Sequence, residues 1–398
     1  MSNPTNKFKE GSKWLLIVAF VGLLWLPTLD VFFGLDKAPA PNERRKPAEF
    51  PKFEASGEGL KRYVTGLEQY FNDHFGFRKR LIRWNNRWKK SWFKDSSMVD
   101  VITGKEEWLY FSGGRMIDLY RGTKVLSEED LQSWQNLLEG RRDWLAERGI
   151  QYVFVIPPTK QSVYPEYLPD WLEPGPFTTI DQFVKHMTAN TTVEIVDLRG
   201  PLIERKGVGP DRVFLHTDSH WNMLGGFFGY QTVIERLQKI FPDMQPLSLD
   251  QFEKYYDDKP GGDLATMMGQ ENTLIERGDI SLAPIASLPK FETRVLTNLF
   301  NKKWAKYAEP IHTVNPSATR KAVVFRDSFT GNLIPFLGYH FNEIYYIWQY
   351  NWNKAFIEEV KPDIVMDIMV EAYFNQTDPR EMKVLDEKPE ITRASHNQ

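Results

Sequence analysis

The chain contains no cysteine and only seven histidines among its 398 residues. The absence of cysteine excludes disulfides, thiolate nucleophiles and cysteine-ligated zinc or iron–sulfur sites. An excess of charge of one sign is also lacking, because 50 basic and 53 acidic residues leave a formal net charge of −3. No overall basic field therefore favours nucleic acid as a partner. Any catalysis must use oxygen or nitrogen groups, and a hydrophobic content of 41% supplies the core of a globular protein.

The longest apolar run lies near the N-terminus, from Trp14 to Leu35. Its length matches the hydrocarbon core of a bilayer, and the lysines within residues 1–13 favour a cytoplasmic N-terminus. A cleaved signal peptide is the alternative, but Pro41 follows the only small-residue exit signal and would hinder cleavage. The sequence therefore predicts a single-pass inner-membrane anchor at 14–35, with the body of the chain in the periplasm or another extracytoplasmic space.

A proline-rich linker at 36–58 precedes a helical region at 59–100, in which Gly76 is expected to break the helix. Beyond it, helical patterns near 126–148, after Thr178 and from Met223 to Phe241 alternate with short apolar runs. These runs are EEWLYF, YVFVIPP, VEIVDL, RVFL, KAVVF, EIYYIW and DIVMDIMV. The alternation predicts an α/β domain with a mostly parallel sheet at 101–377. We interpret 241–320 as a lid or an insertion and 378–398 as a C-terminal tail.

The stretch HTDSHWN, residues 216–222, follows the strand-like RVFL and precedes a helix that Asn222 would cap. In extended backbone His216, Asp218 and His220 would share one face, which is compatible with a metal site. The outer α-carbons would then lie roughly 13 Å apart, at the limit for two imidazoles on one ion. An aspartate that orients a histidine two residues away suits acid–base chemistry better. Plain polar packing of the loop is the third interpretation.

A nucleophile for such a pair occurs in KAVVFRDSFTGNLIPFL. The strand at 322–325 runs into Ser328, and Gly331–Leu337 is typical of a helix. Ser328 would then lie on a sharp turn, with backbone amides near its oxygen that can hold an oxyanion. A serine that only caps the helix is the alternative interpretation.

Several segments together resemble a known family. They are PNERRKPAEFP, LEQYFNDHFGFR, GKEEWLYF, VIPPTKQSVYPEYLP, DSHWN, GGDLATMMG, FRDSF and KPDIVMDIMVEAYF. In this order they resemble the alginate O-acetyltransferase-related proteins, a membrane-associated group of SGNH hydrolase-like proteins, over residues 41–374. The resemblance implies a Rossmann-like SGNH fold with Ser328 as nucleophile, His220 as general base and Asp218 as its orienting partner. It implies neither a cofactor nor a metal.

The oxyanion hole departs from the pattern of SGNH esterases. Their Gly-Asp-Ser block appears here with Arg326 in place of glycine, and no clear match exists for their separate glycine and asparagine blocks. The candidates for the hole are the Ser328 amide and the side chain of Asn332, which is equally compatible with an ordinary helical residue.

Further candidates surround this motif. Arg326 is interpreted as a surface charge, a partner for Asp327 or a contact to an anionic sugar. Trp348 and Tyr350 lie in the aromatic run YYIWQYNWN, where they would either stack on a glycan or belong to the core.

The resemblance implies O-acetylation of a bacterial extracellular polysaccharide, with acetyl groups delivered by a separate multi-pass membrane acyltransferase. A deacetylating esterase of carbohydrates would use the same three residues, because the fold does not determine the reaction. A non-catalytic glycan-binding scaffold is the third alternative, since the oxyanion motif is incomplete.

Overall fold

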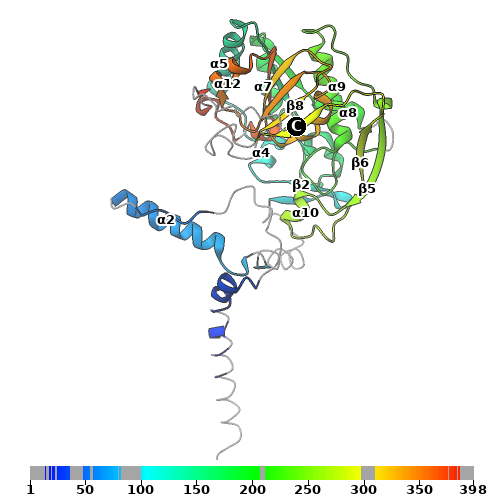
Figure 1. Cartoon of the computed structure of the whole chain (residues 1–398). Helices are drawn as coiled ribbons and strands as arrows, with labels where there is room; N and C mark the ends of the chain where they lie inside the picture. Colours follow the sequence, from blue (N-terminus) through cyan, green and yellow to red (C-terminus); the bar gives the residue numbers. More distant parts are fainter. Residues whose placement is uncertain are drawn as a thin grey trace, which may run out of the picture. The chain divides into compact units, whose positions relative to one another are not determined.

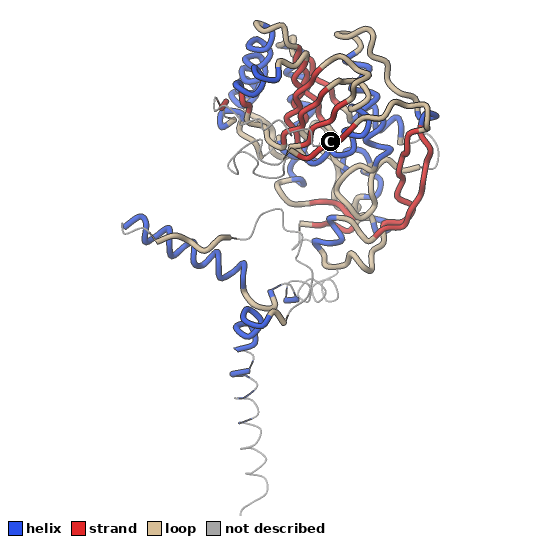
Figure 2. The backbone as a smooth tube through the Cα atoms, in the orientation of Figure 1, coloured by secondary structure: helices blue, strands red, loops and turns tan. Residues whose placement is uncertain are grey.

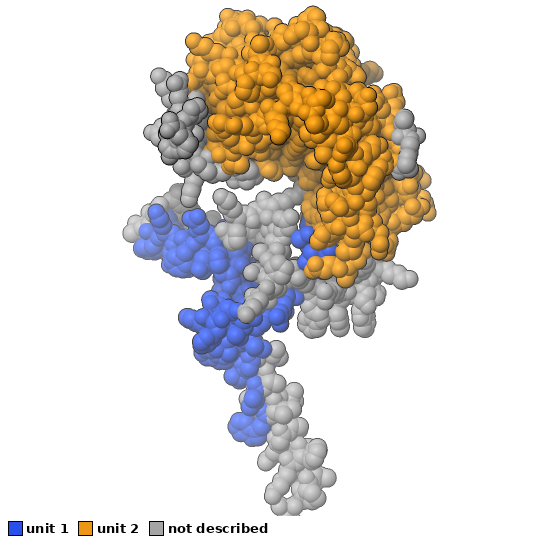
Figure 3. Space-filling view, turned by 45° about the vertical axis from the view of Figure 1, so that its right-hand side comes forward, with its two compact units in different colours: residues 1–99, 265–271 blue, residues 100–264, 272–398 orange. Residues whose placement is uncertain are grey.

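The structure, a computed structural model, describes residues 14, 18, 20–22, 25–35, 48–53, 57–78, 80–81, 100–206, 211–296, 310–374, 376–382 and 384–385. The predicted cytoplasmic stretch, most of the linker and the end of the predicted tail lie outside the described residues. The chain forms two compact units, residues 1–99 with 265–271 and residues 100–264 with 272–398 (Figure 3). Each unit is described by itself.

The first unit contains helix α2 (Gly57–His74). Phe50 packs edge-on against Tyr70 of this helix, with ring centroids 5.2 Å apart. The chain turns at Gly76, where a Cβ atom would lie 1.9 Å from the carbonyl oxygen of Pro27. The predicted break at Gly76 is confirmed, because α2 ends at His74 and a turn follows. A larger residue at this position would clash with the Pro27 backbone. The helical pattern predicted for residues 82–93 lies outside the described residues.

Residues 25–33 are helical and expose large apolar side chains, among them Trp25, Phe32 and Phe33. Within the described ranges, no helix combines the length and the apolar character that crossing a membrane requires. The predicted span at 14–35 is only partly covered by those ranges.

The second unit is built on a seven-stranded sheet with the order β4-β3-β12-β9-β10-β8-β7 (Figures 1 and 2). The bounds are β3 Gln151–Ile156, β4 Glu194–Asp197, β7 Glu292–Val295, β8 Ile311–Val314, β9 Lys321–Arg326, β10 Glu343–Ile347 and β12 Ile364–Ile368. Strands β4, β3, β12, β9 and β10 run parallel, whereas β8 and β7 are antiparallel to their neighbours. The sheet is therefore mixed, and the prediction of a mostly parallel sheet is wrong.

The physical reason for this error lies at the β7 edge. All four residues of β7 (ETRV) are exposed, so this strand carries no buried apolar run that the sequence pattern could reveal. The parallel strands are different, because burial on both faces makes them continuous apolar runs. Strands β3, β4, β9, β10 and β12 each coincide with a predicted run.

Helices cover both faces of this sheet. One face carries α5 (Glu128–Ala146), α7 (Thr179–Asn190) and α12 (Lys354–Val360), and the other carries α8 (Arg199–Arg205), α9 (Met223–Leu237) and α11 (Ile334–Leu337) (Figure 1). Side chains of β9 alternate between the two cores: Phe325 lies in the cluster of Trp134, and Val324 lies in that of Phe227. The predicted helices near 126–148, after Thr178 and from Met223 are confirmed.

Shorter elements complete the second unit. They are β1 Val101–Thr103, η2 Lys105–Glu107, β2 Leu109–Phe111, α4 Met116–Arg121, α6 Lys160–Val163, η3 Pro165–Tyr167, η4 Leu249–Gln251, β5 Phe252–Lys259, β6 Glu276–Pro284, η5 Ser328–Asn332, β11 Trp352–Asn353, η6 Glu371–Tyr373, η7 Pro379–Glu381 and β13 Val384–Leu385, while α10 (Asp263–Met267) joins residues of both units. In the region predicted as a lid or insertion, β5 and β6 pair as an antiparallel hairpin. Its role as a lid stays a prediction.

One buried ion pair links α5 to the sheet and allows a test of the fold. Asp367 of β12 accepts hydrogen bonds from Arg141, from the hydroxyl of Tyr152 (2.6 Å) and from the indole of Trp352 (2.8 Å). We expect Asp367→Ala to lower the free energy of unfolding by about 3–5 kcal/mol, because it leaves a buried guanidinium without its counter-charge. Urea unfolding followed by circular dichroism measures the loss. As a control, Asp243→Ala removes an exposed carboxylate and should leave the unfolding midpoint unchanged.

Candidate functional site

Ser328 lies in a turn at the carboxyl end of strand β9. Asp327, the N-cap of η5, accepts a hydrogen bond from the Phe329 amide at 2.9 Å. Its second carboxylate oxygen accepts from the Tyr350 hydroxyl and from the Val370 amide, both at 2.7 Å. Burial raises the pKa of Asp327, although all three donors favour its charged form. These bonds connect the turn to segments beyond β10 and β12, so the position of Ser328 is set by the sheet.

The predicted strand RVFL is instead one side of a short hairpin loop. The Leu215 amide donates to the His220 carbonyl and the Asn222 amide donates to the Val213 carbonyl, both at 3.1 Å. The chain reverses direction between Leu215 and His220, and the two sides of the loop form only a single β-bridge, between Phe214 and Trp221. Asn222 caps α9 by accepting from the Gly225 amide at 2.9 Å, as predicted.

The hairpin loop and the serine turn meet at His220. Its Nε2 atom lies 2.8 Å from the Ser328 hydroxyl oxygen, and its Nδ1 atom lies 2.7 Å from a carboxylate oxygen of Asp218. The His220 backbone amide also donates to Asp218, at 2.9 Å, which folds the two residues into a local turn. The structure therefore brings Asp218, His220 and Ser328 into hydrogen-bonding contact.

The electrostatics of Asp218 determine how His220 is oriented. Burial would raise the pKa of Asp218, but its bond to the imidazole, the imidazole charge and two backbone amides outweigh burial and hold that pKa below its ordinary value. An ionised Asp218 only accepts hydrogen bonds, so it selects the tautomer with hydrogen on Nδ1. Nε2 is then free to accept the Ser328 proton, as a general base must.

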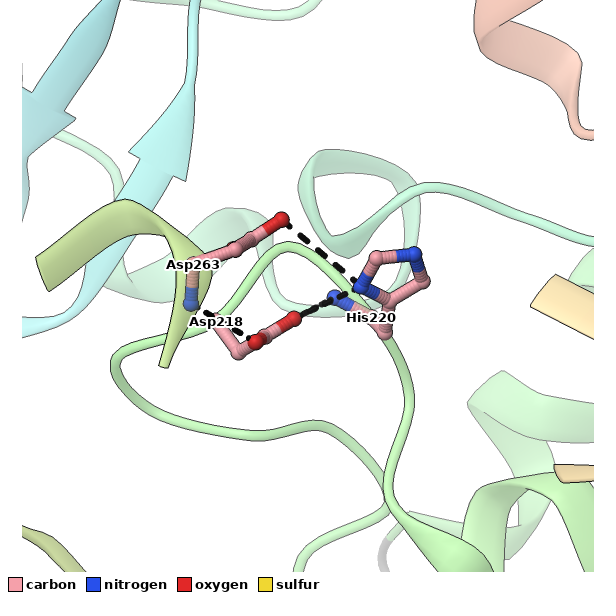
Figure 4. Close-up of side chains that lie close together, drawn as sticks. All are labelled: Asp218, His220 and Asp263. Atoms are coloured by element: carbon pink, nitrogen blue, oxygen red, sulfur yellow. Dashed lines mark hydrogen bonds and ion pairs between the residues drawn. The ribbon is translucent and has the colours of Figure 1, made fainter. Parts of the chain in front are cut away.

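Asp263 approaches the same side of His220 (Figure 4). One of its carboxylate oxygens lies 3.7 Å from His220 Nδ1, and its amide donates to Asp218 at 2.8 Å. Its carboxylate accepts from both the amide and the hydroxyl of Ser219, at 2.7 and 2.6 Å. Sequence reasoning missed Asp263. The available signal was its place in GGDLATMMG, one of the segments that carry the family resemblance. In the structure, a Cβ atom at the preceding Gly262 would lie 2.4 Å from that of Asp218.

A buried glutamate on β6 holds the start of the loop. Glu276 accepts from the amides of His216 (2.8 Å) and Thr217 (2.7 Å), from the Thr217 hydroxyl and from Arg212. Burial would raise the pKa of Glu276, but these donors lower it below the ordinary value. The hairpin of β5 and β6 therefore stabilises the loop that carries Asp218 and His220.

Lys160 supports the loop from the other side. Its buried ammonium donates to the carbonyls of Leu109 (2.7 Å) and His216 (3.2 Å) and lies 5.6 Å from the centre of the Trp108 ring. Burial lowers the pKa of Lys160 to about 8, against the opposing effect of nearby carboxylates, of which Asp218 is the largest contributor. The lysine thus adds positive charge beneath an acidic cluster.

Comparison with known proteins agrees with this architecture. A family model described as the SGNH hydrolase-like domain of acetyltransferase AlgX matches residues 101–294. A protein of Pseudomonas fluorescens named probable alginate O-acetylase AlgJ is 29% identical over 189 residues, covering 47% of this chain and 44% of that protein. The Pseudomonas aeruginosa protein of the same name is 27% identical over 192 residues, covering 47% and 42%. Over somewhat less than half of its length, the chain is similar to the alginate O-acetyltransferase-related proteins.

The match to these named relatives is partial, since it spans less than half of their length. A solved structure extends the similarity of the fold: PatB1 of Bacillus cereus superposes with a TM-score of 0.52 at 14% identity, covering 71% of this chain and 99% of that one. The second unit is an SGNH hydrolase-like α/β domain.

The remaining predicted site residues lie close by, in contacts that hold the turn. Arg326 is buried, donates to the Asp327 carbonyl at 3.0 Å and lies 4.8 Å from the centre of the Trp348 ring. The alternative interpretation of Arg326 as a surface charge is wrong, because its side chain is buried. The Tyr350 hydroxyl donates a hydrogen bond to Asp327, and the side-chain amide of Asn332 donates one to the Trp221 carbonyl at 2.8 Å. Glycan and oxyanion roles for these residues stay predictions.

His216 is directed away from a shared metal. Its Nε2 atom lies 2.8 Å from the Glu106 carbonyl oxygen, and its ring packs edge-on against Trp108. Among the described residues, Asp218, His220 and Asp263 place ligand atoms within 4.8 Å of one another, as a metal would require. Hydrogen bonds among these residues already account for this proximity, and an ion on Nδ1 would have to displace the proton between His220 and Asp218.

The metal alternative is tested by composition and stability. We expect the purified protein to hold less than stoichiometric zinc or iron by plasma mass spectrometry, and exhaustive chelation to leave its melting temperature unchanged. One metal per chain, removed by chelation with loss of stability and restored on addition, would favour the metal site over the hydrogen-bonded pair.

Lys160 makes stability depend on pH. Its folded-state pKa of about 8 lies below the unfolded value of 10.5, so the unfolded chain binds more protons between these values and stability rises with pH. We expect the free energy of unfolding to rise by about 2 kcal/mol from pH 8 to 10 relative to the Lys160→Met variant. Urea unfolding of both proteins across this range measures the difference, and parallel curves would contradict the prediction.

Proposed function

We propose that this protein is an O-acetyltransferase that acetylates a bacterial extracellular polysaccharide through an acetyl-serine on Ser328. The observation that carries the proposal is the position of His220, hydrogen-bonded between Ser328 and Asp218. The relatives named probable alginate O-acetylase support the acetyl group and a polysaccharide acceptor.

The mechanism has two displacements. As the Ser328 oxygen attacks the donor's acetyl carbonyl, His220 Nε2 takes the hydroxyl proton, and Asp218 stabilises the imidazolium that forms. The donor's leaving group departs with that proton, which leaves acetyl-serine. A sugar hydroxyl then gives its proton to Nε2 and attacks the acetyl-serine; collapse of the adduct returns the proton to Ser328 and releases the acetylated sugar. The Ser328 amide is the proposed donor to the oxyanion in both steps.

The proposed enzyme would work at the inner membrane, together with a separate acetyl donor. The acetyl group would come from a separate multi-pass membrane acyltransferase, and no cofactor takes part. The apolar segment 14–35, which exposes Trp25, Phe32 and Phe33, would anchor the chain in the inner membrane with the second unit in the periplasm. Anchoring would hold the enzyme beside a polymer that is being exported.

Transfer and hydrolysis are distinguished by the fate of the acetyl group. The purified chain is incubated with an activated acetyl ester, with and without oligosaccharides that include uronate and neutral sugars. Free acetate and acetylated sugar are both measured by mass spectrometry. A transferase labels a sugar, because its bound hydroxyl reaches the acetyl-serine in better geometry than water.

Ser328→Ala should reduce that labelling by at least about 10³-fold, since it removes the nucleophile. Asp243→Asn, an exposed position in a surface ion pair, serves as the control. Removal of acetyl from a pre-acetylated oligosaccharide, without labelling of any sugar, would identify a deacetylase. Binding of a glycan without either reaction would favour the scaffold.

A further inference from the structure

Asp263 is connected to all three residues of the segment Asp218–His220. Its backbone amide donates to Asp218, its carboxylate accepts two hydrogen bonds from Ser219, and one carboxylate oxygen lies 3.7 Å from His220 Nδ1 (Figure 4). The mechanism proposed above uses only Asp218 on that side of the imidazole. The role of the second carboxylate is therefore open.

The hydrogen bonds of Ser219 link Asp263 to His220. The Ser219 hydroxyl donates its only hydrogen to Asp263, so towards His220 its oxygen can only accept. That oxygen lies 3.3 Å from His220 Nδ1. Ser219 and Asp218 thus both accept from Nδ1, and the Ser219 contact is fixed by Asp263. The tautomer with its hydrogen on Nε2 would be unable to take the Ser328 proton. Both acceptors, Asp218 and Ser219, disfavour that tautomer because each faces Nδ1.

Asp263 also acts on His220 through its charge. The side chains of Asp218 and Asp263 are only 17% and 18% exposed, and that of His220 is 26% exposed, so solvent screens their interaction incompletely. Two negative charges beside Nδ1 favour an imidazolium more than one does. Among the described residues, the charged groups near this cluster include Asp327, which interacts with His220, and Lys160, whose charge acts on both carboxylates. Glu276 and Arg212 form an ion pair behind the loop and also act on Lys160, with opposite signs.

We propose that Asp263 is a positioning residue of the active site, which fixes the tautomer of His220 through Ser219 and supplies a second negative charge to its imidazolium. The inference rests on the proposed function of His220 as general base. It differs from a purely structural role, in which Asp263 would only tie the loop to α10.

The test measures how fast Ser328 reacts with a small aryl sulfonyl fluoride in the full-length chain. The serine oxygen forms a bond to sulfur, fluoride leaves, and His220 takes the proton, so the reaction requires no sugar acceptor. Intact-mass spectrometry follows labelling between pH 4 and 9, and the rate rises with pH as His220 becomes neutral. Wild type is compared with Asp263→Asn, Ser219→Ala and the surface control Asp243→Asn, each checked for folding by circular dichroism.

We expect Asp263→Asn to move the half-maximal pH of labelling down by about one unit, because loss of the carboxylate removes a charge 3.7 Å from Nδ1. Its plateau rate should fall about threefold, since a less basic imidazole abstracts the proton less well. Ser219→Ala keeps the carboxylate, so it should lower the plateau with a smaller shift in pH. Asp243→Asn should match wild type in both.

An unshifted half-maximal pH in folded Asp263→Asn overturns the inference and leaves Asp263 with a structural role, even if the plateau falls. Failure of wild-type Ser328 to label at any pH counts instead against the proposed function. In that event the ¹⁵N resonances of His220, assigned with His220→Gln, still decide the inference: the same downward shift of the titration midpoint in Asp263→Asn supports it, and equal midpoints overturn it.

Discussion

The hydrogen bond from the Val370 amide to Asp327 connects the turn of the candidate nucleophile to the strand beside it in the sheet. The same device recurs around the site: Glu276 binds the amides that precede Asp218, and Asp263 binds the amide that precedes His220. A buried carboxylate is stable only where several donors satisfy it, so each of these links has a demanding geometry. In a chain without cysteine, such links take the place of covalent crosslinks in positioning the loops.

This dependence explains which parts of the fold can be predicted from the sequence. Strands β3, β9 and β12 are buried on both faces, so burial alone makes them continuous apolar runs. Strand β7 pairs with β8 and exposes all four of its residues, so its composition does not mark it as a strand. The run RVFL is apolar because it is buried, yet the reversal after it prevents a ladder. An apolar run therefore predicts that a segment is buried more reliably than it predicts that the segment pairs with another strand.

The same distinction applies to the site. Asp218 and His220 are neighbours in the chain, and Ser328 follows a strand, so local pattern identifies all three as candidates. Asp263 and Glu276 are 44 and 60 residues from the backbone amides of Ser219 and His216 that they bind. Only the tertiary structure shows such contacts. Conversely, Tyr350 is an aromatic residue of the kind that stacks on sugars, but in the structure its hydroxyl donates a hydrogen bond to Asp327.

The charges around His220 also balance one another. Lys160 is buried, and the carboxylates of Asp218, Glu276 and Asp263 are what counter the effect of burial on its ammonium. In the proposed mechanism His220 gains a positive charge near this cation when it takes the serine proton, and Asp218 alone would then have to stabilise the imidazolium while it also acts on Lys160. Asp218 and Asp263 both lie beside Nδ1, so two carboxylates face the imidazole while Lys160 holds the loop through the His216 carbonyl. The proposed role of His220 therefore depends on more acidic groups than the single aspartate that orients it.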